Sequence, residues 1–149
     1  MNYAVLDHLS EDEKRIRTDV FITEQGFLHE FDDIDEYATH LLAYDGDTPV
    51  GCGRIYEILR DSPAAASPAA PPPVYAIGRI ALVKEYRGMQ LGSAIVWKLT
   101  RMAEEYGAKT IQLSAQCRAR GFYEKCGFTA VGEIYMDEQY PHILMRKIL

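Results

Sequence analysis

The feature that most constrains the fold is an apolar strand followed by a glycine-containing turn and a helix. The segment Val74–Val83 is nearly all apolar, as a strand buried on both faces would be. From Leu91 onward, apolar residues recur at helical spacing as far as Tyr106, and Gly107 favours a helix end. A strand, a turn and a helix in this order predict an α/β sheet.

The rest of the chain alternates in the same way. Ser10 and Glu13 fit a capping box, in which each side chain accepts from a backbone N–H of the first turn, so we expect a helix to about residue 22. A second, short helix is expected at 117–127, and an Asp-Gly pair at 45–46 favours a hairpin. Further strands are expected at 3–9, 40–44, 49–59, 109–115, 128–136 and 142–149. At 149 residues the chain predicts one α/β domain, with a mixed, mostly antiparallel central sheet flanked by helices.

One segment does not fit this alternation. Residues 61–73, rich in proline and alanine, predict a loop insert, because proline cannot donate to a sheet ladder. Neither flank is large enough to fold well alone, so we do not expect a domain boundary there.

Composition excludes several classes of protein. The chain has 16 basic and 22 acidic residues, a formal net charge of −6, which argues against nucleic-acid binding. The three cysteines, with no paired spacing, favour free thiols in a reducing compartment. No apolar stretch predicts a signal peptide or a membrane span. We therefore expect a cytoplasmic protein with no membrane partner.

The turn between the buried strand and its helix reads as a phosphate cradle. The first amides of a helix lack internal partners and carry partial positive charge, and glycines let an anion approach the backbone. Arg87 adds charge, and the turn has glycines at positions 88 and 92, but neither the triphosphate nor the dinucleotide fingerprint is present. Read alone, the turn fits phosphate binding and a plain strand-to-helix connection equally well.

The neighbouring motifs distinguish the two interpretations. "RGMQLGSA" follows "IGRIALVKEY" and precedes "AQCRARGFYEKCGF", and this combination resembles the GNAT superfamily of acyl-coenzyme A-dependent N-acetyltransferases. Arg87 and Gly92 match the ends of that family's loop pattern, with Gln90 in place of its middle glycine. Phe122 and Tyr123 match its later helix motif, with Gln116 in place of an asparagine. The N-terminal "RTDVFITEQGFLHEFDDIDEYATH" and C-terminal "PHILMRK" further resemble its ElaA-like branch.

The resemblance implies acetyl-CoA as cosubstrate and direct attack by an amine in a ternary complex. It implies that the strand Ile80–Val83 lines the pantetheine arm, with a backbone N–H near Leu82 polarising the thioester carbonyl. If the loop requires positive φ at position 90, glutamine there costs about 1 kcal/mol or more. The coenzyme-binding residues it implies are Ile80, Ala81, Leu82, Arg87, Gly88, Met89, Gln90, Leu91, Gly92, Ser93, Gln116 and Phe122.

The resemblance also implies that Tyr123 is the general acid. A phenol with a pKa near ~10 stays protonated at neutral pH and can protonate a departing thiolate. The chain has ten tyrosines, and a plain core aromatic is the alternative for this one.

The acidic stretch 30–36 holds five carboxylates in seven residues, with Glu24 just upstream. Most charge runs are solvated loops, but this one could attract a cationic amine and take its proton. We expect Glu24 or Glu30 to act as general base and Asp32 to bind the acceptor.

The histidines leave two alternatives open. His40 and His142 lie in family-like stretches, and each is expected either to bind the acceptor or to be a satisfied structural group. A metal site built from Glu24, His29 and His40 lacks ligand spacing, and we expect no metal.

The sequence therefore predicts an acetyl-CoA-dependent N-acetyltransferase that acts on an amine of a small molecule or peptide. A non-catalytic acyl-CoA sensor is the alternative, and a purely structural interaction protein the third. The apolar C-terminal end leaves a homodimer open.

Overall fold

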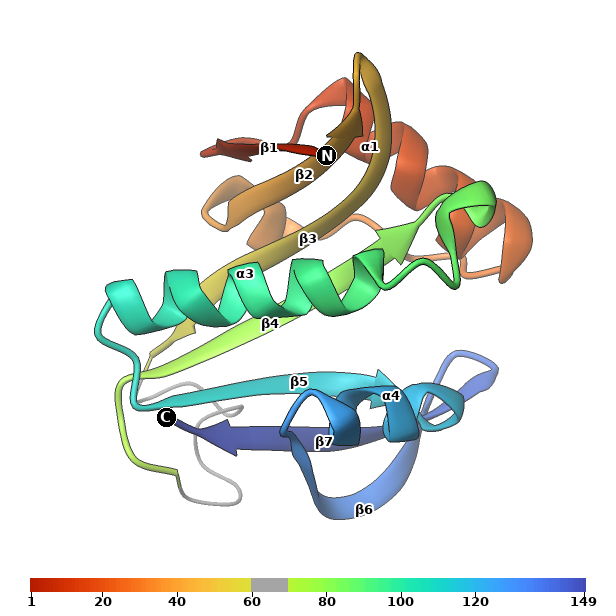
Figure 1. The fold of residues 1–149 in the computed structure, drawn as a ribbon. Coiled ribbons are helices and arrows are strands. Elements are labelled where there is room, and N and C mark those ends of the chain that lie inside the picture. The colour runs from red at the N-terminus through yellow and green to blue at the C-terminus, as the bar shows by residue number, and fades with distance from the viewer. Residues whose placement is uncertain (60–69) are drawn as a thin grey trace. The chain divides into compact units, whose positions relative to one another are not determined.

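The structure is a computed structural model, which describes residues 1–59 and 70–149 (Figure 1). Most of the predicted insert at 61–73 therefore lies outside the described residues. The helices and strands follow in the order β1 (Asn2–Leu6), α1 (Glu11–Arg17), the π-helix η1 (Thr18–Glu24), the 3-10 turn η2 (Asp33–Glu36), β2 (Thr39–Asp45), β3 (Thr48–Ile58), β4 (Val74–Leu82), the 3-10 turn η3 (Lys84–Tyr86), α3 (Leu91–Glu105), β5 (Thr110–Gln116), the 3-10 turn η4 (Cys117–Ala119), α4 (Arg120–Lys125), β6 (Thr129–Asp137) and β7 (Tyr140–Ile148).

The strands form a seven-stranded mixed sheet in the order β1-β2-β3-β4-β5-β7-β6. Strands β4 and β5 are parallel, whereas β1 with β2, β2 with β3, β5 with β7 and β6 with β7 are antiparallel. This confirms the predicted α/β class, including the antiparallel closing pair and the hairpin between β2 and β3.

The chain forms two compact units, which we describe one at a time. The first comprises Met1–Tyr56 and Arg79–Leu99, and the second comprises Glu57–Gly78 and Thr100–Leu149. The limit between them falls inside β4, after Gly78. That the whole chain is one domain stays a prediction.

In the first unit, successive residues of β3 point to opposite faces of the sheet, and each face is covered by a helix. A Cβ at Gly51 or Gly53 would meet Ile95 or Leu99 of α3 at 2.8 Å, so only glycine lets the helix lie this close. Cys52, between them, points the other way and joins a buried apolar cluster with α1. That cluster contains Ile16, Val20, Leu42, Cys52 and Ala81.

Helix α1 begins as predicted but continues differently. The N–H of Glu13 donates to Ser10 Oγ at 3.2 Å, which confirms Ser10 as the N-cap. The Glu13 side chain does not return to the cap, because it is buried in an ion network described below. Beyond Arg17 the helix continues as the π-helix η1, which ends at Glu24, two residues later than expected.

In the second unit, the antiparallel hairpin β6–β7 continues the sheet from β5. Phe128, which directly precedes β6, is buried, and its ring lies against Tyr123 of α4 with ring centroids 6.2 Å apart. No helix in the described ranges combines the length and apolarity needed to cross a bilayer.

Candidate functional site

The predicted phosphate loop follows β4 and η3 and leads into α3. Gly88 and Gln90 both have left-handed backbone, with φ of 81° and 64°. The side chains from Arg87 to Gln90 are exposed, whereas Leu91 is buried and begins the helix. The loop therefore presents a short exposed turn before the N-terminus of a 15-residue helix, where backbone amides are available to an anion. Because Gln90 has positive φ, the cost expected for a non-glycine residue applies here.

Two residues predicted for different roles lie together in this region. Arg87 donates from Nη1 and Nη2 to both carboxylate oxygens of Glu24, at 2.8 and 3.0 Å. Its Nε and Nη2 also donate to the backbone carbonyl of Leu82, at 3.1 and 2.9 Å. Hydrogen bonding to Arg87 lowers the pKa of Glu24, so this carboxylate is a weaker base than an isolated one. Arg87 thus ties the loop to the end of η1 and to β4.

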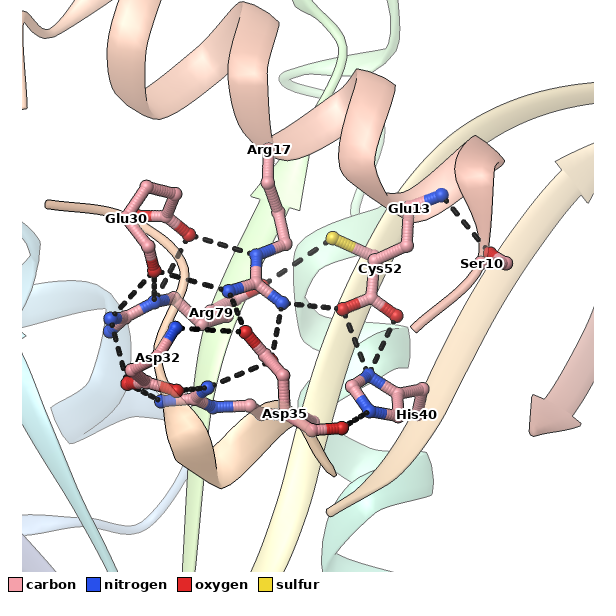
Figure 2. Close-up of polar contacts among 10 residues, drawn as sticks. Ser10, Glu13, Arg17, Glu30, Asp32, Asp35, His40, Cys52 and Arg79 are labelled. Atoms are coloured by element: carbon pink, nitrogen blue, oxygen red, sulfur yellow. Dashed lines mark hydrogen bonds and ion pairs between the residues drawn. The ribbon is translucent and has the colours of Figure 1, made fainter. Parts of the chain in front are cut away.

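A largely buried ion network in the first unit joins α1 to the acidic stretch, β3 and β4 (Figure 2). Arg17, which is fully buried, uses all five of its N–H donors. Nη1 donates to Glu13 Oε2 at 2.7 Å and to Asp35 Oδ1 at 2.8 Å, and Nε donates to Glu30 Oε2 at 2.8 Å. Nη2 donates to Asp35 Oδ2 at 3.0 Å and to the Glu30 carbonyl at 3.2 Å.

Two more arginines form ion pairs with carboxylates of the acidic stretch. Arg54 of β3 donates to both oxygens of Asp32, at 2.6 and 3.0 Å, and to Asp35 at 2.9 Å. Arg79 of β4 lies 3.0 Å from Glu30 Oε2 and 3.3 Å from Asp32 Oδ2. The acidic residues 30, 32 and 35 are therefore not a freely solvated run, because arginines from α1, β3 and β4 hold them.

Their surroundings shift the pKa values of the candidate carboxylates in different directions. Burial works to raise the pKa of Asp35, but the hydrogen bonds and charges of Arg17 and Arg54 outweigh it and hold this pKa at about 2. Burial also raises the pKa of Glu30, and there the charges of Arg79 and Arg17 offset it only in part. Of the predicted bases, Glu30 has a raised pKa and Glu24 a lowered one.

His40 is fully buried within the same network. Its Nδ1 lies 2.9 Å from both oxygens of Glu13, and its Nε2 lies 3.0 Å from the Asp35 carbonyl (Figure 2). Burial works to lower the pKa of His40, but the hydrogen bond to Glu13 outweighs it and raises this pKa. Both neighbours can accept, so a His40 ring with protons on both nitrogens would satisfy both contacts, in agreement with the raised pKa. With both nitrogens engaged, it has none for an acceptor substrate, and the geometry favours the structural interpretation.

Three groups that could ligate a metal lie within this network. Ligand atoms of Glu13, Asp35 and His40 lie within 4.8 Å of one another. The Arg17 guanidinium already donates to both carboxylates, so it supplies the positive charge that a metal ion would bring to this group. The four carboxylates Glu13, Glu30, Asp32 and Asp35 face three guanidinium groups, and the imidazolium of His40 makes the charges equal.

The remaining predicted residues lie in the second unit. The Tyr123 ring packs edge-on against Phe122, with centroids 5.0 Å apart, and burial raises the pKa of Tyr123 to about 12. It remains protonated at neutral pH, as a general acid requires. Gln116 ends β5 opposite His142 of β7. The His142 Nδ1–H donates to the Tyr140 carbonyl at 2.9 Å.

Sequence reasoning missed Arg17, Arg54 and Arg79. Two of them left a signal. Arg17 stands four residues after Glu13 on one helix face, and Arg54 interrupts the apolar strand "VGCGRI". The partners of both lie far along the chain, which the local pattern does not reveal.

Comparison with known proteins gives consistent matches. The family model described as the acetyltransferase (GNAT) family matches residues 3–128. A putative acetyltransferase of Bacillus subtilis is 35% identical over 137 residues, which cover 89% of this chain and 84% of that protein. The structure is similar to an acyl-CoA N-acyltransferase from Pseudomonas aeruginosa, with a TM-score of 0.81, 26% identity and 99% of both chains covered. It is also similar to Escherichia coli ElaA, with a TM-score of 0.79, 26% identity and 98% of both chains covered.

Proposed function

The chain belongs to the GNAT acetyltransferase family and is ElaA-like, and on that premise we propose that it transfers an acetyl group from acetyl-CoA to a primary amine. The acceptor is a small molecule or an exposed peptide amine. The observation that carries this proposal is the family match over residues 3–128, which spans both the loop Arg87–Ser93 and Tyr123.

The loop is proposed to hold the pyrophosphate of the coenzyme. Left-handed backbone at Gly88 and Gln90 and the helix N-terminus that follows support this role, because such turns direct amides to one side. The Arg87 side chain already forms an ion pair with Glu24, so we assign it mainly to positioning the loop, with backbone amides as the chief phosphate ligands. Residues Ile80 to Leu82 are proposed to pair with the pantetheine arm.

Transfer proceeds by direct attack. A primary amine has a pKa near ~10.4 and arrives protonated at neutral pH, so a base is needed first. We assign this step to Glu30, directly or through water, because burial raises its pKa whereas the pKa of Glu24 is lowered. The amine nitrogen then bonds to the thioester carbonyl carbon, and the carbon–sulfur bond breaks. Tyr123 is proposed to give its phenolic proton to the leaving thiolate.

The coenzyme-binding step is tested by titration calorimetry with CoA. Gly88 and Gly46 form a matched pair, because both have positive φ and a Cβ at either would meet no atom within 4 Å. Substitution by alanine should therefore cause a similar backbone strain at both positions, yet only Gly88 lies in the loop. We expect Gly88→Ala to weaken CoA binding at least about tenfold, and Gly46→Ala to leave it unchanged. If both variants bound CoA with equal affinity, the loop would not be part of the coenzyme site.

Turnover is tested by thiol release from acetyl-CoA in the presence of amines, polyamines, aminoglycosides and peptides. Release that depends on one acceptor class supports transfer and identifies that class. CoA binding with no release from any acceptor favours the second candidate, a non-catalytic acyl-CoA sensor. The replacement of the family's middle glycine by Gln90, which has φ of 64°, is the observation that keeps the sensor under consideration.

A further inference from the structure

A strained residue lies inside β4. Arg79 has φ of 49°, the left-handed region, although it is a bulky residue in a strand. Gln90 and Glu138, which share this property, lie in turns between elements. Bulky residues adopt this conformation rarely, and it persists only where the surroundings hold it. The three residues that follow, Ile80 to Leu82, are those proposed to pair with the acyl-coenzyme arm.

Contacts on both sides of Arg79 hold this conformation. Its Nε and Nη2 donate to the backbone carbonyl of Glu30 at 3.1 and 3.0 Å, and the side chain forms ion pairs with Glu30 and Asp32. Its own carbonyl accepts from the Cys52 thiol, with sulfur and oxygen 3.4 Å apart. The guanidinium and the carbonyl are thus fixed independently, from the acidic segment and from β3 (Figure 2).

Buried residues of the first unit in turn fix the acidic stretch, residues 30–36. Glu30 accepts from Arg17, which is fully buried, and Arg17 is fixed by Glu13 and Asp35. The segment contacted by Arg79 therefore cannot shift without breaking buried ion pairs, which is costly. The half-buried side chain of Arg79 joins this rigid network to the backbone of β4.

We propose that Arg79 is a positioning residue for acyl transfer: its side chain, bound to Glu30 and Asp32, keeps the backbone of β4 at this residue in the left-handed conformation that directs the amides of Ile80–Leu82. The inference rests on the proposed function, in which those amides bind and polarise the acyl thioester. Arg79 itself makes no contact with the reacting atoms. It acts by fixing backbone, which glycine could adopt without strain.

The test compares Arg79→Ala with Arg79→Gly. Both variants lose the guanidinium and its ion pairs, so any purely electrostatic or stabilising role is lost equally. Only glycine adopts φ near 49° without a Cβ penalty. We expect Arg79→Ala to lower kcat about tenfold or more, with kcat/KM for acetyl-CoA falling in parallel, since the amides act in the transition state. Both variants also lose the charge that partly offsets the raised pKa of Glu30, so the two are compared with each other, and we expect kcat of Arg79→Gly to exceed that of Arg79→Ala by about threefold or more.

Amide hydrogen exchange supplies a readout independent of activity. The amides of Ile80–Leu82 should exchange about tenfold faster or more in Arg79→Ala than in wild type, and Arg79→Gly should lie nearer wild type. Should the alanine variant not fold, Arg79→Asn replaces it, because asparagine tolerates left-handed backbone better than most residues and should give intermediate values.

Two outcomes overturn the inference. One is equal loss of rate and protection in the glycine and alanine variants, which would mean that the charge alone matters. The other is wild-type kcat and wild-type amide exchange in both variants, which would mean that the left-handed backbone at position 79 does not depend on the arginine side chain. A wild-type protein that binds no CoA and releases no thiol would instead defeat the proposed function, and the exchange comparison would still test Arg79.

Discussion

Removal of the Arg17 guanidinium should destabilise the protein more than any other single truncation in the ion network. Arg17→Met keeps much of the apolar volume but leaves Glu13, Glu30 and Asp35 around a site with no shared cation. All five N–H donors of Arg17 are used, and its side chain is fully buried. Breaking a buried ion pair by removing one partner costs about 3–5 kcal/mol. A simple sum over the five bonds would be comparable to the whole stability of an ordinary domain, so carboxylates must take up protons and limit the loss.

The magnitude is measured by urea unfolding at neutral pH. We expect the free energy of unfolding to fall by about 3–5 kcal/mol, which lowers Tm by about 6–20 °C in a chain of this size. The matched control is Arg15→Met, because Arg15 lies on the same helix but is exposed. That change should stay within about 0.5 kcal/mol.

The pH dependence of the deficit adds a second check. In Arg17→Met, Asp35 and Glu30 lose the cation that works to lower their pKa values, so the folded-state pKa values of these two carboxyl groups rise. A raised folded pKa adds stability as the pH falls, so the deficit should shrink towards pH ~5. A loss below about 1 kcal/mol, or a loss equal to that of Arg15→Met, would refute the reasoning that the network is buried and tightly coupled.

Three further predictions concern single residues. Because the folded pKa of His40 is raised, its stabilising contribution is complete below its unfolded pKa of about 6.5 and is lost as the pH rises through the folded value. The Tm difference between wild type and His40→Gln should therefore narrow from about pH 6 to pH 9, and a constant difference would contradict this. Gln90→Gly removes a left-handed cost of ~1–2 kcal/mol but adds ~0.4–1 kcal/mol of unfolded-chain entropy, so urea unfolding should show a gain of up to about 1.6 kcal/mol with CoA affinity kept. A loss of stability there would mean that the glutamine side chain contributes. Tyr123→Phe should lower kcat by roughly 10²–10⁴ while calorimetry shows unchanged CoA affinity, and unchanged turnover would remove Tyr123 as the acid.

Local sequence signals predicted the elements well. The Ser10 cap, the Asp-Gly hairpin turn and the strand–turn–helix around Gly88 depend on neighbours within a few residues, and the structure has each of them. The free cysteines were also predicted. These features follow from backbone chemistry that a short window contains.

The candidate site was less predictable because its partners are distant in sequence. Arg17 meets Asp35 across 18 residues, and Arg79 meets Glu30 across 49. From the sequence, the carboxylates of the acidic stretch read as a charged mouth for a cationic amine. The fold supplies arginines that pair with three of them, Glu30, Asp32 and Asp35, and Glu13 leaves its expected capping role for the same network.

The strained backbone of Arg79 was unpredictable for the same reason, because its partners are also distant in sequence. Positive φ at Arg79 has no sequence signature, because arginine is not a residue that favours left-handed backbone. It depends on contacts from Glu30 and Cys52.

The central claim is that the protein transfers an acyl group from coenzyme A to an amine. The most direct measurement supplies acetyl-CoA with a deuterated acetyl group, together with the amine panel, and follows both acceptors and protein by mass spectrometry. The account predicts the labelled acetyl group on an amine acceptor, free CoA in equal amount, and unmodified protein. Label on the protein itself, or no labelled product from any acceptor together with no CoA binding, would contradict it.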